Sequence, residues 1–307
     1  MTSDRTLLHA AGQAYAIPDE GGTVPPWMPV DALGKPAGVR AGDVPWTQAP
    51  VGVACGETPG LFDDAGLVGR TAEGVVIALR GTRLSISPKR APLLWVTDWV
   101  NNLAIGLTSD GDAPAEEASH GGFRLAAHRV ARTLRPQIQA ALAAAAKTAP
   151  IYVTGHSKGG AMAPFVARWL IAQGLATGRR VVVRTFAAPR LCGAGFRDAY
   201  LASGVDHLRY EAFGDVVPML PLTGPIAWPL LALAPDSVRR NAATVVLAGY
   251  VDLGPGRYIR PSGALIDIHT AGRHRLSDLE AIAEPGDPTF LTQHSITRGS
   301  TYADRVP

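Results

Sequence analysis

Short apolar runs alternate along this chain with longer stretches in which apolar residues recur at helical spacing. Residues 74–79, 151–154 and 181–186 are rich in β-branched apolar residues, and residues 206–211 form a fourth strand-like run. Strands that are apolar on both faces are typical of the centre of a parallel sheet. Their alternation with helices predicts an α/β fold with a mostly parallel, doubly wound central sheet and helices on both of its faces.

Further elements are predicted on either side of these strands. Strands are expected at residues 51–54, 245–250 and 264–268, and helices at residues 6–16, 120–147 and 273–283. Within the long helical region, Pro136 predicts a kink or a break into two helices. Residues 18–50 are rich in proline and glycine and predict a loop that wraps the surface, with Trp27, Met28 and Trp46 as anchors on the core.

Two stretches are too long or too apolar to be simple connections. Residues 83–117 have polar, proline-rich ends and an apolar centre with Trp95, Trp99 and Leu103. Residues 222–244 contain a second apolar run with Trp228 and Leu230, interrupted by prolines. Because long loops in compact domains are usually lids or binding elements, we expect a single domain over residues 1–307 with two lid-like or cap-like insertions. A packed helix without mobility in the first, and core filling rather than an acyl pocket in the second, stay open.

The strand at residues 151–154 leads into the sequence Gly155-His-Ser157-Lys-Gly159, and a helical stripe of apolar residues follows at once. A Gly-x-Ser-x-Gly sequence between a strand and a helix is the context of a nucleophile elbow. Since glycine has no Cβ, the backbone can turn sharply enough to raise Ser157 clear of the chain. The serine would lie at a helix N-terminus, where unpaired N–H groups favour negative charge. The sequence therefore predicts that Ser157 is a nucleophile.

A serine nucleophile needs a carboxylate that orients its base, and in α/β hydrolases the partners follow in the order Ser, Asp, His. Asp215 directly follows the strand at residues 206–211, between Gly214 and Pro218, and is the expected carboxylate. Asp206 begins that strand at its amino end, and Asp236 has the pattern of a helix N-cap, so both fit less well.

The base is expected among the histidines that follow Asp215, which are His269, His274 and His294. His294 lies in a polar loop near the chain end, where it can fold back over the elbow, and we predict that it is the base. His156 leaves the backbone beside Ser157 in the opposite direction and is expected to pack and hydrogen-bond below the turn.

A developing oxyanion needs preorganised hydrogen-bond donors. The main-chain N–H of Lys158, at the start of the helix after the elbow, is one expected donor. The second should come from a loop after an earlier central strand. Thr82 follows the strand at residues 74–79 and offers both an N–H and a hydroxyl, although an ordinary turn residue is the alternative.

Several motifs, in this order, resemble the class 3 lipases, the fungal-lipase-like branch of the α/β hydrolases. The matching segments are Leu79-Arg-Gly-Thr82, Asp98-Trp-Val-Asn-Asn-Leu103, His120-Gly-Gly-Phe123, Val153-Thr-Gly-His-Ser-Lys-Gly-Gly160, Phe186-Ala-Ala-Pro-Arg190, Gly214-Asp-Val-Val-Pro218 and His294. The resemblance implies the α/β-hydrolase fold, a triad of Ser157, Asp215 and His294, an oxyanion hole at Thr82 and Lys158, and a helical lid around Trp99. This chain departs from the family in two ways, because Lys158 stands where the fungal enzymes usually have leucine and both insertions are longer.

We therefore expect a serine carboxylic-ester hydrolase, a lipase or esterase, that cleaves acyl esters of lipid-like substrates through an acyl-enzyme. This chemistry requires no metal and no organic cofactor. The expected partners are a small-molecule or lipid ester and a transient lipid interface, and the oligomeric state stays open. The alternatives are a phospholipase or thioesterase using the same site, a lipase effector delivered to a neighbouring cell, and a binding protein that keeps the fold without turnover.

Composition adds few constraints to this interpretation. The net charge is +3 and the arginines are scattered, which argues against nucleic-acid binding. Cys55 and Cys192 have no metal-like spacing, and whether they pair is left open. The first residues lack the pattern of a signal peptide, and no apolar run is long enough to span a bilayer. We expect a cytoplasmic enzyme, or one exported by a route without an N-terminal signal.

Overall fold

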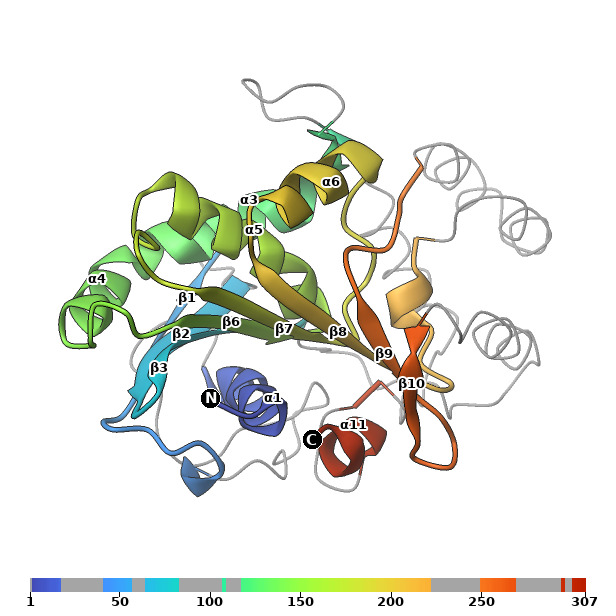
Figure 1. Cartoon of the computed structure of the whole chain (residues 1–307), viewed down its shortest axis with the longest axis horizontal. Helices are drawn as coiled ribbons and strands as arrows, with labels where there is room; N and C mark the ends of the chain where they lie inside the picture. Colours follow the sequence, from blue (N-terminus) through green and yellow to red (C-terminus); the bar gives the residue numbers. More distant parts are fainter. Residues whose placement is uncertain are drawn as a thin grey trace.

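The computed structural model describes residues 2–17, 41–56, 64–82, 107–108, 117–221, 249–268, 294–295 and 300–307. Within these residues, eight strands form one sheet in the order β1-β2-β3-β6-β7-β8-β9-β10. Helices cover both faces of this sheet (Figure 1). This is the predicted α/β arrangement.

The strands of the sheet are β1 (Val51–Cys55), β2 (Asp64–Thr71), β3 (Gly74–Leu79), β6 (Ile151–His156), β7 (Val181–Phe186), β8 (Asp206–Ala212), β9 (Gly256–Ile259) and β10 (Leu265–Asp267). From β3 to β9 neighbouring strands are parallel, and the pairs β1-β2, β2-β3 and β9-β10 at the two edges are antiparallel. Every residue of β3 and β6 is buried, as the apolar runs predict for central strands. A separate short pair joins β4 (Leu107–Thr108) to β5 (Ser119–His120).

The described helices that connect β3, β6, β7 and β8 lie on one face of the sheet (Figure 1). They are α3 (Gly121–Thr133), α4 (Arg135–Ala143), α5 (Lys158–Ala172) and α6 (Ala194–Ala202). The opposite face is covered by α1 (Asp4–Gln13) and α11 (Thr301–Arg305), from the two ends of the described chain. Between β3 and β8 the described crossovers thus lie on one side only, whereas a doubly wound sheet was expected. Strands β3, β6, β7 and β8 lie side by side in the sheet in the same order as they occur in the chain. Right-handed crossovers between them therefore place the connecting helices on the same side.

Each face of the sheet has its own core. The core under α3, α4, α5 and α6 includes Ile77, Val153 and Val183. The core on the other face includes Val76, Tyr152 and Val182, packed against α1 and the short turn η1 (Ala14–Ala16). Successive strand residues point to opposite faces, so neighbouring valines in one strand serve different cores.

Several local predictions are confirmed. Pro136 lies in the first turn of α4 and separates it from α3, as expected for a residue without an N–H. The motif at residues 120–123 has a structural role, because His120 Nδ1 accepts a hydrogen bond from the Phe123 N–H at 3.2 Å and caps α3. Trp46 packs against the second core and donates to Gln13 Oε1 at 2.7 Å.

Other elements were missed or lie outside the described residues. Strands β2 and β9 were not predicted, because their glycines and charged residues obscure the apolar pattern. Gly249 and Tyr250 do not belong to a strand, so the end of the strand expected at residues 245–250 was wrong. Several predictions lie outside the described residues. They concern the helix at residues 273–283, the anchors Trp27 and Met28, and nearly all of both insertions, including Trp95, Trp99, Leu103, Trp228 and Leu230.

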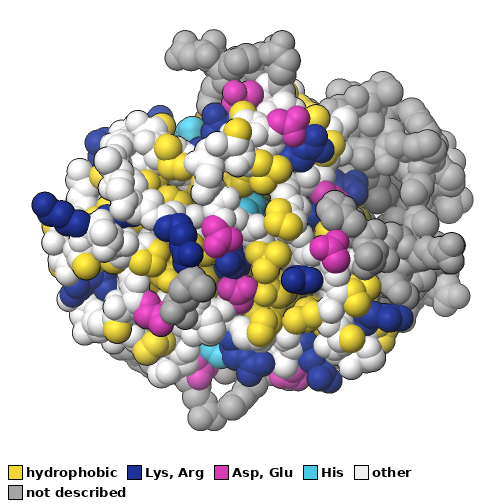
Figure 2. Space-filling model, in the orientation of Figure 1, with side chains coloured by type: hydrophobic (Ala, Val, Ile, Leu, Met, Phe, Trp, Pro, Cys, Tyr) yellow, Lys and Arg dark blue, Asp and Glu magenta, His cyan; other side chains and the backbone are white. Residues whose placement is uncertain are grey.

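Cys55 and Cys192 are both free thiols. In the part of the chain that the structure describes, no cluster of His, Cys, Asp or Glu could hold a metal ion. Over the same residues, no helix has both the length and the apolar character needed to cross a membrane. On the face seen in Figure 2, basic and acidic side chains are interspersed, in keeping with the scattered charges of the sequence.

The first turn of α5 lies so close to the sheet that only glycine fits at two positions. A Cβ on Gly159 would lie 2.2 Å from the Leu79 carbonyl oxygen of β3. A Cβ on Gly155, at the end of β6, would lie 2.3 Å from the Gly159 carbonyl. These distances are far inside van der Waals contact, so the two glycines determine how closely the helix approaches β3 and β6.

We predict that Gly155→Ala destabilises the protein by at least about 3 kcal/mol, since its methyl group would collide with main-chain atoms that cannot move aside cheaply. Gly42→Ala is the matched control, because a Cβ there has no atom within 4 Å. It should change the free energy of unfolding by no more than about 0.5 kcal/mol. Urea unfolding of both variants measures this, and equal midpoints would contradict the prediction.

Candidate active site

Ser157 stands at the turn between β6 and α5 in a backbone conformation that is unusual for a residue with a side chain. Its φ is 57° and its ψ is −128°. Such strain persists only where the surrounding structure over-determines it, and it clusters at functional sites. The Ser157 N–H donates to the Phe186 carbonyl of β7 at 2.9 Å, and the side chain makes no capping hydrogen bond to α5. The hydroxyl is therefore not used to cap the helix, and the geometry is that of a nucleophile elbow.

Asp215 lies just beyond β8, and its side chain is fully buried. The His294 Nδ1 lies 3.1 Å from each of its carboxylate oxygens. The Val217 N–H donates to Oδ1 at 3.1 Å, and the Tyr302 hydroxyl donates to Oδ2 at 2.7 Å. The loop after β8 and helix α11 thus hold one carboxylate against one imidazole.

His294 is oriented by this contact in the way that a general base requires. A carboxylate accepts hydrogen bonds, so the proton of the neutral His294 ring lies on Nδ1. The other nitrogen, Nε2, then carries a lone pair and can accept a proton. Asp206, the weaker aspartate candidate, lies at the other end of β8 and pairs with Arg184 at 3.1 Å. His269, His274 and Asp236 lie outside the described residues.

The main chain of His294 is attached directly to the elbow. His156 precedes Ser157, and its Nε2 lies 2.7 Å from the His294 carbonyl oxygen. The two imidazole rings have centroids 4.7 Å apart. The histidine that was expected to return to the elbow from near the chain end therefore lies against the residue next to Ser157.

The protonation of His156 follows from its partners. Burial lowers the pKa of His156 well below the ordinary value of 6.5, and the neighbouring His294 lowers it further, so the ring is neutral. Because a carbonyl oxygen only accepts hydrogen bonds, the single ring proton is on Nε2, which donates to the His294 carbonyl oxygen. Nδ1 then accepts a hydrogen bond from the Tyr15 hydroxyl at 2.8 Å. His156 packs and hydrogen-bonds below the turn, as its direction along the chain predicts.

Tyr302 supports the other side of the pair. Burial, with Asp215 next in order, raises the pKa of the Tyr302 hydroxyl well above 10, so the phenol keeps its proton and donates it to Asp215. The same oxygen accepts the Ala212 N–H at 2.9 Å. Helix α11 thereby ties the end of β8 to the carboxylate.

One expected oxyanion donor follows the elbow directly in the chain, and the other follows a glycine that lies close to Ser157 in space. Lys158 is the first residue of α5. Thr82 follows Gly81, where a Cβ would lie 3.1 Å from the Ser157 Cβ and 2.0 Å from the Tyr15 hydroxyl. The chain after β3 therefore passes close beside Ser157, and a side chain at position 81 would not fit.

Sequence reasoning missed three contributors to this site. Tyr15 and Tyr302 come from the N-terminal and C-terminal segments, and Asp64 forms an ion pair with Lys158. No local motif marks them, because each acts through a residue far away in the chain. The one available signal was weak: Tyr15 lies between two alanines in a segment predicted as a helix.

Comparisons with known proteins find lipases among the relatives of this chain. Residues 76–224 match the family described as Lipase (class 3). A lipase of Caenorhabditis elegans is 41% identical over 71 residues, which is 23% of this chain and 20% of the relative. A secreted mono- and diacylglycerol lipase of Fusarium solani is 27% identical over 190 residues, 62% of this chain and 53% of the relative. The chain thus spans about half or less of the length of these curated relatives.

A solved structure supports the fold. The crystal structure of a fungal lipase superimposes with a TM-score of 0.53 at 20% identity, covering 83% of this chain and 78% of that chain. At this level of identity the likeness is one of fold alone. The family match includes the elbow and the loop after β8, so the part of the chain that carries the candidate site is similar to the class 3 lipases.

Proposed function

We propose that this protein is a serine carboxylic-ester hydrolase that acts through an acyl-enzyme. The observation that carries the proposal is the buried hydrogen bond between His294 and Asp215, held against the residue next to Ser157. A strained serine alone would predict little, because its hydroxyl is a poor nucleophile without a base.

In the proposed first half-reaction, His294 Nε2 removes the proton from Ser157 Oγ as that oxygen bonds to the carbonyl carbon of the ester. Asp215 keeps the imidazole in the required tautomer and stabilises the imidazolium that forms. The tetrahedral intermediate then collapses, the bond between carbon and the leaving oxygen breaks, and Nε2 gives the proton to that oxygen. The alcohol leaves and Ser157 carries the acyl group.

In the second half-reaction, water replaces the alcohol. His294 takes a proton from water as the oxygen attacks the acyl carbon. It gives that proton to Ser157 Oγ as the bond between that oxygen and the acyl carbon breaks, which releases the acid and regenerates the free enzyme. In both steps the oxyanion is proposed to accept hydrogen bonds from the main-chain N–H groups of Thr82 and Lys158. No step of this chemistry needs a metal or an organic cofactor.

We propose acyl esters of lipid-like compounds as the substrate class. Support comes from the family match and from the Fusarium solani relative, which is named as a mono- and diacylglycerol lipase. A transient contact with a lipid interface belongs to the same proposal. Phospholipid and thioester cleavage use the same chemistry and are alternative outcomes of a substrate survey.

Ser157→Ala should lower kcat for p-nitrophenyl esters by at least about a thousandfold, because it removes the nucleophile. The survey should run from acetate to palmitate, and a fluorophosphonate probe should label the wild type only. Ser262→Ala is the control, since this serine lies in an exposed turn near the edge strand β10 and should retain full activity. Equal rates for wild type and Ser157→Ala would remove the proposed mechanism, and absence of labelling in the wild type would favour a binding protein without turnover.

Asp215→Asn should lower kcat by about three to four orders of magnitude, because an amide stabilises the wrong imidazole tautomer. Asp206→Asn is the matched control at the opposite end of β8, and its loss of one ion pair to Arg184 should leave kcat within about twofold. Steady-state kinetics on one ester measures both variants. The assignment of Asp215 would be wrong if its variant kept the activity of the control.

Tyr302→Phe removes only the hydroxyl that donates to Asp215 and should lower kcat by about tenfold, in the range of one hydrogen bond to a charged group. KM should stay unchanged, because the hydroxyl lies behind the carboxylate. Kinetics and urea unfolding of the same preparation separate this effect from a general loss of stability. A change confined to KM would contradict it.

A further inference from the structure

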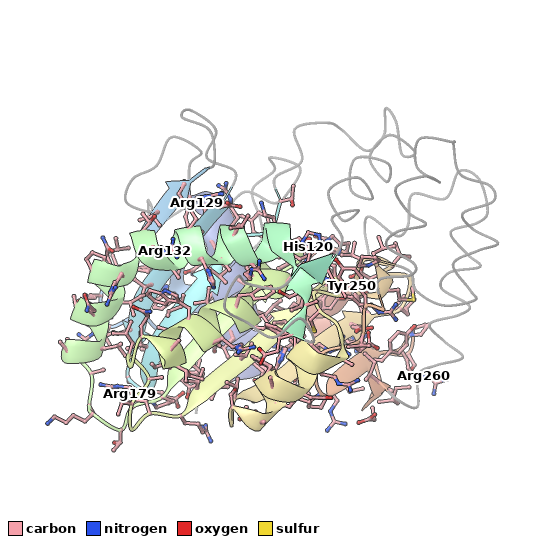
Figure 3. All side chains as sticks on the ribbon, turned by 90° about the horizontal axis from the view of Figure 1, so that it is seen from above. His120, Arg129, Arg132, Arg179, Tyr250 and Arg260 are labelled. Atoms are coloured by element: carbon pink, nitrogen blue, oxygen red, sulfur yellow. The ribbon has the colours of Figure 1, made fainter. Side chains whose placement is uncertain are left out.

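A partly buried ion cluster includes the side chain of Lys158, whose main-chain N–H is a proposed oxyanion donor. The Lys158 Nζ is 2.6 Å from Asp64 Oδ1, and the Arg129 Nη1 is 2.5 Å from Asp64 Oδ2. The Asp64 side chain is only 1% exposed, whereas those of Lys158 and Arg129 are 18% and 25% exposed. One carboxylate therefore joins the start of α5, the start of β2 and the middle of α3, where Figure 3 shows Arg129.

Asp64 also lies next to the strand that leads to the other proposed donor. It is the first residue of β2, and its neighbour Ala65 accepts the Arg80 N–H at 2.9 Å. Arg80 is followed by Gly81 and Thr82. The start of β2 thus contacts the segments of both proposed donors. Ala65 is hydrogen-bonded to Arg80, two residues before Thr82, and Asp64 forms an ion pair with Lys158.

The presence of this cluster is weak evidence for a gain in stability. Burying a carboxylate and a partner cation costs desolvation free energy, and apolar residues of similar volume often stabilise a protein as well or better. An ion pair differs from an apolar contact in that it specifies position, because its energy depends on one donor meeting one acceptor. The position of Lys158 affects catalysis, because its N–H is proposed to donate to the oxyanion. Small displacements of such donors lower the rate strongly.

We propose that Asp64 is a positioning residue for the hydrolase. Asp64 fixes the Lys158 side chain and so orients the main-chain N–H of Lys158 towards the oxyanion, while Arg129 holds the carboxylate in place. The inference rests on the proposed function and deepens it. Lys158, the residue after Ser157, is held by an ion cluster that joins α5, β2 and α3.

The test uses the full chain and four variants: D64N, K158M, the double variant D64N/K158M, and R168M as a matched control. R168M breaks another ion pair of α5, between Arg168 and Glu117 at 2.7 Å, in the last turns of that helix and away from Ser157. For each protein, kcat and KM are measured on p-nitrophenyl butyrate, the active serine is counted with a fluorophosphonate, and stability is measured in urea.

We expect D64N and K158M each to lower kcat per labelled serine by about tenfold to fiftyfold, less than the loss of a whole oxyanion donor. KM should stay within about twofold of wild type, and the double variant should be no slower than the slower single variant, because both changes break one interaction. R168M should keep wild-type kcat. K158M alone carries the test if D64N does not fold, since its side chain reaches solvent.

Wild-type kcat in K158M or D64N, or independent effects that multiply in the double variant, would overturn the positioning role. A loss of stability with kcat per labelled serine unchanged would also overturn it, because the cluster would then act only on folding. Failure of the proposed function looks different, since the wild type itself would neither label with the fluorophosphonate nor hydrolyse any ester.

Discussion

The close approach of α5 to the sheet is the constraint on which the rest of the site depends. Gly155 and Gly159 let the first turn of the helix touch the main chain of β3 and β6, at distances that no side chain would allow. Ser157 lies between them and is held in a left-handed backbone conformation. Packing of main chain on main chain thus provides the over-determination that strained residues need. This packing sets the backbone conformation of Ser157 without any contribution from His294 or Asp215.

The groups that support His294 come from one face of the sheet, the face that α1 and α11 cover. From the face of α1, Tyr15 supports His156, which holds the main chain of His294. From α11, Tyr302 supports Asp215, which holds the His294 ring. His156 and Asp215 are therefore each hydrogen-bonded in turn to a buried tyrosine. The ends of the described chain close the second core and also order the candidate site.

The sequence predicted what local patterns encode. The apolar runs at β3, β6 and β7 located the central strands, and the Gly-x-Ser-x-Gly sequence located the elbow. Chain order singled out Asp215 and His294, and the structure places their side chains 3.1 Å apart. Their catalytic roles, like those of Thr82 and Lys158, are proposals that rest on chemistry.

What the sequence could not predict depends on long-range contacts. Tyr15 lies 141 residues from His156, and Tyr302 lies 87 residues from Asp215. Asp64 begins a strand whose glycines and charged ends hide its apolar pattern. The one-sided winding between β3 and β8 was missed for a related reason, because strand order is a tertiary property that no single strand contains. Local sequence patterns thus predicted the candidate catalytic residues, but not Tyr15, Tyr302 and Asp64, which contact them or their neighbours.

The most direct measurement of the central claim is a crystal structure of the protein after reaction with an alkyl phosphonate, which mimics the tetrahedral intermediate. The account predicts phosphorus bonded to Ser157 Oγ, with one phosphonate oxygen about 2.7–3.1 Å from the main-chain nitrogens of Thr82 and Lys158. His294 Nε2 should lie within hydrogen-bond distance of Ser157 Oγ. An adduct on another residue, or a phosphonate oxygen directed away from both nitrogens with His294 turned from Ser157, would contradict it.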